Sequence, residues 1–130
     1  MANVTATVSL VSTITGSPLN TTGSGATLSI TTAGTDVIQS TQDVTTSYAA
    51  PDFGAITFPA LIFIQHTATT DGTTASTDNI ILSTDGTTDS KIAVLPNYKM
   101  LIYMSSKTNF KWKSSGASNI KAFLGAVEIA

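Results

Sequence analysis

Leu61-Ile62-Phe63-Ile64 is the stretch that decides the fold, because it is apolar at every position and therefore on both faces of a strand. Three similar runs follow it: Ile80-Ile81-Leu82, Ile92-Ala93-Val94-Leu95 and Met100-Leu101-Ile102-Tyr103-Met104. Turn-forming dipeptides lie between the runs, and the Asp-Gly pairs at 71–72 and 85–86 favour tight type I′ turns. These patterns predict short β-strands that are covered on both sides.

The flanking segments show the alternation of half-buried strands. Apolar residues alternate with hydroxyl residues near the N-terminus, at Val4, Ala6, Val8 and Leu10 and again at Ala26, Leu28 and Ile30. Phe110 and Trp112 alternate with lysines, and residues 120–129 form a mostly apolar final strand. No window holds an uninterrupted helical stripe, so eight to ten short strands predict one all-β domain over residues 1–130, an antiparallel sandwich or a barrel.

The composition excludes several classes of protein. The chain has 130 residues, the size of one domain, and its lack of cysteine excludes a disulfide scaffold, a thiol enzyme and a cysteine-based metal site. Charged residues make up 11%, against roughly 25% in an ordinary soluble domain, and Ser and Thr replace them. No apolar run reaches the length of a membrane span, and the first residues do not resemble a signal peptide.

The charges are divided between two parts of the chain. Residues 1–90 contain only acidic charges, all from aspartate, whereas residues 91–130 contain all the lysines and a single acid, Glu128. Because arginine and an overall basic surface are missing, we do not expect nucleic-acid binding. Two interpretations stay open: aspartates in turns with lysines at strand edges, or oppositely charged faces that meet in an assembly.

Strands that are apolar on both faces need cover on the second face, and the sequence predicts no helix to supply it. Loops at 15–25 and 67–78 can cover part of it, and other copies of the chain are the remaining candidate. Leaving several large apolar side chains in water costs several kcal/mol at roughly 25 cal/mol per Å². We therefore expect a homo-oligomer, a trimer, with residues 1–14 as an exchanged or partner-contacting strand. The predicted interface residues are Val4, Val8, Leu10, Leu61, Phe63, Met100, Ile102 and Tyr103.

Few residues are arranged for chemistry. His66 is the only histidine, and its position at a strand end favours a structural role over a metal site shared by three copies. Four aspartates lie in neighbouring loops that can converge on a cation, although the spacing of a calcium-binding loop is missing. They are Asp71, Asp78, Asp85 and Asp89. We expect no metal, no cofactor and no catalytic residue, since G-x-S-x-G is also missing.

A sugar-binding platform is a further hypothesis, because aromatic rings stack on the faces of sugars. Its candidate residues are Trp112, Tyr48, Tyr98 and Tyr103. Trp112 alternates with lysines, however, so it is predicted to point into the core.

Three segments of the C-terminal half carry a resemblance to a known group of proteins. They are Ser90-Lys91-Ile92-Ala93-Val94-Leu95-Pro96-Asn97-Tyr98-Lys99-Met100-Leu101-Ile102-Tyr103, Phe110-Lys111-Trp112-Lys113, and the run from Ile120 to Ile129. This order of loop, strand, Leu-Pro corner, strand and final apolar strand resembles small β-sandwich virion proteins of tailed bacteriophages over residues 58–130. Asn97 stands where glycine is usual after the proline, and asparagine can also adopt the left-handed conformation.

The resemblance implies a jelly-roll-like β-sandwich and a non-enzymatic virion structural protein. The expected role is a capsid decoration (cement) protein that oligomerises on the major capsid protein and stabilises the head shell. Such a protein is made in the host cytoplasm and resides on the capsid surface, without membrane or nucleic-acid partners. The alternatives are a head–tail or tail-tip/fibre structural protein, or a glycan-binding surface module.

Overall fold

The computed structural model describes residues 2–7, 11–12, 19–20, 27–32, 36–88 and 92–129, with side chains described from residue 36 onward. Within these residues it contains eleven β-strands, one short 3₁₀ helix and no α-helix. The predicted all-β class is confirmed. The strands exceed the predicted eight to ten because the first 35 residues contribute four strands where alternation predicted two.

The strands lie in chain order, with the 3₁₀ helix η1 between the ninth and the tenth. Their bounds are β1 (Ala2–Thr7), β2 (Val11–Ser12), β3 (Leu19–Asn20), β4 (Thr27–Thr32), β5 (Val37–Val44), β6 (Ala60–His66), β7 (Ile80–Ser83), β8 (Ile92–Val94), β9 (Lys99–Met104), η1 (Lys107–Asn109), β10 (Lys111–Ser114) and β11 (Ile120–Glu128).

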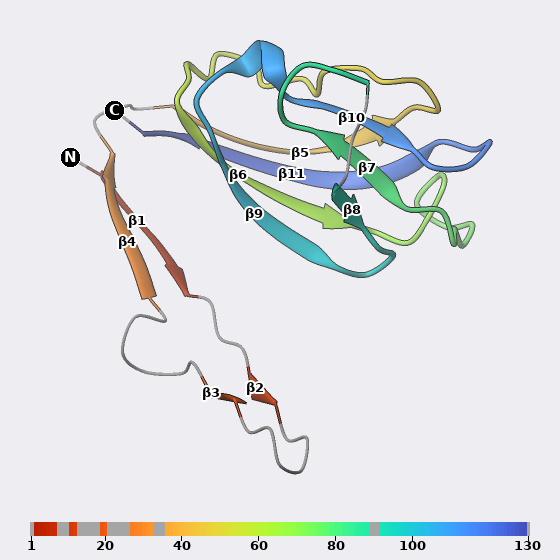
Figure 1. Ribbon diagram of the computed structural model, residues 1–130, viewed down its shortest axis with the longest axis horizontal. Coiled ribbons are helices and arrows are strands. Elements are labelled where there is room, and N and C mark those ends of the chain that lie inside the picture. Colours follow the sequence, from red (N-terminus) through yellow and green to blue (C-terminus); the bar gives the residue numbers. More distant parts are fainter. Residues whose placement is uncertain are drawn as a thin grey trace.

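Two antiparallel sheets form the main body as a sandwich (Figure 1). One sheet has the order β5-β11-β6-β9 and the other the order β10-β7-β8. The chain changes sheet between β6 and β7, between β8 and β9, and at both ends of β10. Between β5 and β6 it also touches the second sheet, where the backbones of Ala49 and Trp112 exchange two hydrogen bonds of 3.1 and 3.0 Å.

The core lies between the sheets and follows from strand alternation. On β11, the buried residues Ile120, Ala122, Leu124 and Ala126 alternate with half-exposed neighbours. The register places Leu124 opposite Ile64 of β6, so that both fill the same layer. Aromatic rings also pack in the core: Phe53 contacts Phe58 and Phe110 edge-to-face at centroid distances of 5.1 and 5.7 Å.

The four N-terminal strands are separate from both large sheets. β1 pairs with β4 over six residues and β2 pairs with β3, all antiparallel. The β1–β4 ladder extends away from the sandwich, starting near the end where β5 begins and β11 ends (Figure 1). The sandwich was expected to include residues 1–130, but its two sheets are formed by β5–β11 only. The expected partner-contacting segment, residues 1–14, is paired within its own chain where it is described.

Candidate functional site

The outward face of the β5-β11-β6-β9 sheet exposes large apolar side chains to solvent. Adjacent strands align its outward residues in rows across the sheet. The first row is Val37, Val127, Leu61 and Tyr103, and the second is Gln39, Gly125, Phe63 and Leu101. We call the apolar residues of these rows, together with Phe123 of the next row, the apolar patch.

The apolar patch is open to solvent at its edges. Val37 is 69% exposed, Tyr103 56% and Leu101 37%, whereas Leu61 in the middle of the sheet is buried. The rings of Phe63 and Phe123 meet edge-to-face at 6.2 Å beside Gly125, which has no side chain to separate them. Large apolar side chains gathered on one sheet face are typical of a contact surface.

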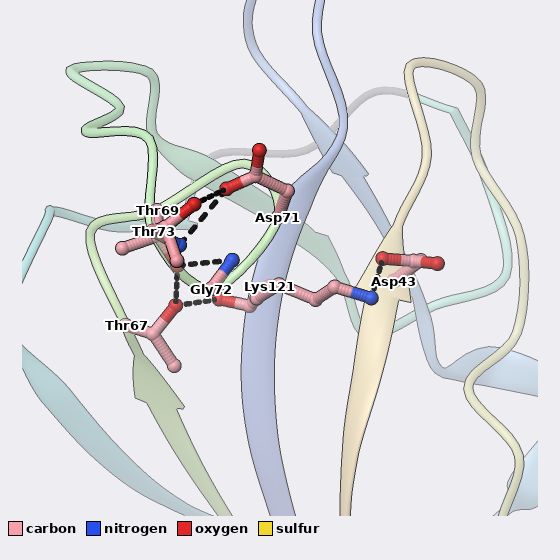
Figure 2. A network of polar contacts seen from close by, with 7 residues as sticks. All are labelled: Asp43, Thr67, Thr69, Asp71, Gly72, Thr73 and Lys121. Carbon is pink, nitrogen blue, oxygen red and sulfur yellow. Dashed lines mark hydrogen bonds and ion pairs between the residues drawn. The ribbon is translucent and has the colours of Figure 1, made fainter.

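A polar network closes the opposite end of the same sheet face (Figure 2). Lys121 of β11 forms a 2.7 Å ion pair with Asp43 of β5. The Thr67 hydroxyl donates to the Lys121 carbonyl at 2.6 Å, and the Lys121 N–H donates to the Thr69 carbonyl at 2.8 Å. Asp43, Thr67 and Lys121 therefore have polar partners within the chain at this end, and the apolar patch lies toward the other end.

The predicted interface residues separate into two groups. Leu61, Phe63 and Tyr103 lie on the outward face, in the apolar patch. Met100 and Ile102 lie on the inward face of β9 and pack against the core, so they leave the set of candidate interface residues. The reason is the two-residue period of a strand, which sends Leu101 and Tyr103 outward when Met100, Ile102 and Met104 point inward.

The N-terminal part of the predicted interface is described only in its backbone. Val4 lies in β1, opposite Ile30 of β4. Val8 and Leu10 lie outside the described residues. Sequence reasoning missed Val37, Val127 and Phe123, because only the long-range pairing of β5 and β11 with β6 brings them to the patch.

The two Asp-Gly loops use their carboxylates to hold their own backbone. Asp71 accepts from the backbone N–H groups of Thr73 and Thr74 at 2.9 and 2.7 Å and from both hydroxyls. These bonds, the Thr74 N–H first, hold the pKa of Asp71 well below its ordinary range. Figure 2 shows this loop beside the Thr67–Lys121 contacts.

Asp85 repeats the arrangement in the next loop. Its carboxylate accepts from the Thr87 hydroxyl at 2.7 Å and the Thr87 N–H at 3.0 Å, which lower the pKa of Asp85. In each loop the glycine, at φ 96° for Gly72 and 81° for Gly86, has a positive φ, but the aspartate before it does not. The predicted type I′ turns are therefore wrong, since that turn requires positive φ at both residues.

The aspartates do not gather around a common point in the described residues. Within residues 36–88 and 92–129, no group of three or more metal-ligating acidic or histidine side chains is placed to hold an ion. Asp71 and Asp85 bond to their own loops, and the Asp78 carboxylate lies against Gly116, while Asp89 lies outside the described residues.

His66 is fully buried, and both of its ring nitrogens are occupied. Nδ1 accepts the Ala68 N–H at 2.9 Å, so the proton sits on Nε2, which donates to the Asp78 carbonyl at 2.7 Å. A metal would have to displace one of these bonds in the core. The Nε2 bond of His66 therefore connects the end of β6 to the segment before β7.

The four aromatic residues of the sugar-platform hypothesis lie in different places. Trp112 is buried in the core, as its alternation with lysines predicted. Tyr48 lies in the segment after β5, with its ring centroid 5.0 Å from the ammonium of Lys113 of β10. Tyr98 and Tyr103 are both exposed but lie at opposite ends of β9, so they do not form one platform.

Three comparisons with known proteins find no counterpart: no protein-family model, no curated protein and no solved structure matches the chain. In the described part of the chain, no helix combines the length and the apolar character that crossing a membrane requires. The function is therefore inferred from the residues of this chain alone.

Proposed function

We propose that this chain is a non-enzymatic virion structural protein, a capsid decoration protein that assembles into oligomers and stabilises the head shell. The single observation that carries this proposal is the apolar patch, which leaves large side chains of β5 and β9 exposed to water on one side of the sandwich. Covering such a patch with protein recovers roughly 25 cal/mol for each Å² removed from water.

The strand order supports the jelly-roll part of the proposal. In an eight-stranded jelly roll, strands B-I-D-G form one sheet and C-H-E-F the other. The order β5-β11-β6-β9 matches the first sheet, and β10-β7-β8 matches H-E-F. The bridge of Ala49 to Trp112 takes the place of strand C beside β10. This fold supports a role in shells only by analogy, because one fold serves many functions.

The mechanism of a decoration protein is mechanical and uses mass action. A copy that binds the assembled shell but not its separated subunits shifts the equilibrium toward the shell, by RT ln(1 + [L]/Kd). Serine and threonine suit such contacts, because hydroxyls form hydrogen bonds across an interface without the cost of desolvating an ion.

Electron cryomicroscopy of tailed-phage particles assembled with and without this chain tests the proposal. We expect density for a two-sheet domain on the outer surface of the head only when the chain is present, and heads that resist heating better with it than without it. Density confined to the tail would overturn the capsid role in favour of a head–tail or fibre role. If particles assembled in the presence of the chain do not contain it at any position, the virion role is wrong.

A further inference from the structure

The first 35 residues differ from the rest of the chain in charge. All fourteen charged side chains lie between Asp36 and Glu128, and residues 1–35 contain none. A segment without charges can be buried against an apolar surface without desolvating an ion. Its many hydroxyl side chains can find hydrogen-bond partners at the edges of such a contact.

The register of the β1–β4 ladder gives it one apolar side. Val4 lies opposite Ile30 and Ala6 lies opposite Leu28, and residues directly opposite in an antiparallel pair share a face. The intervening positions on both strands are Asn, Thr and Ser. Among the described strands, β1 and β4 pair only with each other, and a two-stranded ladder is marginal in water by itself.

From these observations we propose that the β1–β4 ladder of one copy docks its apolar side on the apolar patch of a second copy. The patch is exposed at its edges, and the register of the ladder places its apolar residues on one side. Two of the charged residues on that sheet face, Asp43 and Lys121, lie at the other end and pair with each other, and Lys99 of β9 lies in the row of Phe123 at the border of the patch. The proposal rests on the self-association in the proposed function, but not on attachment to a shell.

The ladder is long enough to cross the apolar patch. A ladder of six residue pairs is roughly 20 Å long at about 3.3 Å per residue. Four strands about 4.8 Å apart span roughly 14 Å from Val37 to Tyr103, so a ladder of this length can cross all four of them. Figure 1 shows the ladder extending away from its own sandwich, so the second copy, rather than its own, is the occupant that this geometry favours.

Cross-linking between two full-length chains tests the docking directly, because the native chain has no cysteine. One chain carries Ile30→Cys, and an isotopically labelled chain carries Leu101→Cys. After mixing and treatment with a short bismaleimide, we expect a cross-link between labelled and unlabelled peptides. The control is Ser29→Cys, on the opposite side of the ladder, which we expect to cross-link at least tenfold less.

Charge substitutions provide a second readout on the same full-length protein. We expect L101K/Y103K to lower the mass in solution to that of a single chain. The control L95K/Y98K changes the same residue types at the exposed β8–β9 corner and should leave the mass unchanged. If L101K/Y103K fails to fold, I30K against S29K makes the same comparison in the ladder.

The outcomes separate this inference from the proposed function. Cross-links found only within one chain, no cross-link at all, or a mass unchanged by L101K/Y103K and I30K would each overturn ladder docking. Any of these results is compatible with a chain that still binds a head shell, whereas a chain that docks its ladder but never enters particles refutes only the virion role.

Discussion

The two ends of the outward face of the β5-β11-β6-β9 sheet differ: one end has polar groups with partners in the chain, and the other has exposed apolar side chains. At the end with Asp43, Thr67 and Lys121, the polar groups are paired by the chain itself. At the other end, Val37 and Tyr103 are largely exposed to water. A sheet can satisfy hydrogen bonds with its own loops, but the loop at 67–76 continues from β6 at the polar end and leaves the apolar end open. The incomplete end therefore marks where assembly is expected.

Two leucines of the same sheet provide the largest expected contrast. Leu124→Ala, in the core, should lower the free energy of unfolding by about 2–5 kcal/mol, because it leaves a cavity. Leu101→Ala, on the apolar patch, should cost about 1 kcal/mol or less in dilute single chains. Urea unfolding at low protein concentration measures both. Equal losses would mean that the patch belongs to the core of the single chain, and the contrast between the ends would fail.

Thr67→Val tests the polar end. The substitution keeps the shape of the side chain but removes the hydroxyl that donates to the Lys121 carbonyl at 2.6 Å. We expect a loss of about 1 kcal/mol in the free energy of unfolding, the net value of a typical hydrogen bond. Thr77→Val, at an exposed position nearby, serves as the control and should change little. A loss no larger than that of the control would mean that the network adds nothing to this end.

The ion pair of Asp43 and Lys121 should contribute less. Both side chains are partly exposed, at 51% and 30%, so solvent screens the attraction. Asp43→Asn should cost about 0.2–1 kcal/mol at low salt. Unfolding at about 1 M salt should remove most of that difference, because charges are then screened within about 3 Å. A cost that stays the same at high salt would point to packing instead of charge.

The smallest effect concerns Asp71, which is fully exposed. Because its pKa is lowered in the folded chain, its carboxylate stabilises the loop above its ordinary pKa of about 3.9. That contribution is lost as the pH falls through the lowered folded value. A carboxyl NMR titration should place the midpoint below the ordinary value, and Thr74→Val, which removes one donor, should raise it. An unshifted midpoint in the native chain would contradict the bonded loop.

Sequence patterns predicted the fold class and part of the core for a physical reason. Phe110 and Trp112 alternate with lysines in one phase only, so the pattern identifies Trp112 directly as an inward side chain. Residues 100–104 are apolar in both phases, and the pattern therefore placed Met100 and Ile102 in the interface, whereas the structure packs them against the core. The choice between the phases depends on pairing with β6, which is long-range and not visible along the chain.

The turns failed for a different reason. Asp-Gly is the usual dipeptide of a type I′ turn, but here the carboxylates of Asp71 and Asp85 accept hydrogen bonds from the residues that follow. Side-chain capping of this kind replaces the backbone conformation that the dipeptide alone favours. At the corner before β9, in contrast, the expected left-handed residue is present, since Asn97 has φ 66°.

The mass of the native chain in solution, measured by sedimentation equilibrium over a wide range of concentrations, tests the central claim most directly. If the apolar patch is a contact between copies, the mass will be a multiple of 13.4 kDa, and L101K/Y103K will return it to 13.4 kDa. A native chain that stays at 13.4 kDa at the highest concentration would contradict the claim, because its apolar patch would then remain in water without a partner.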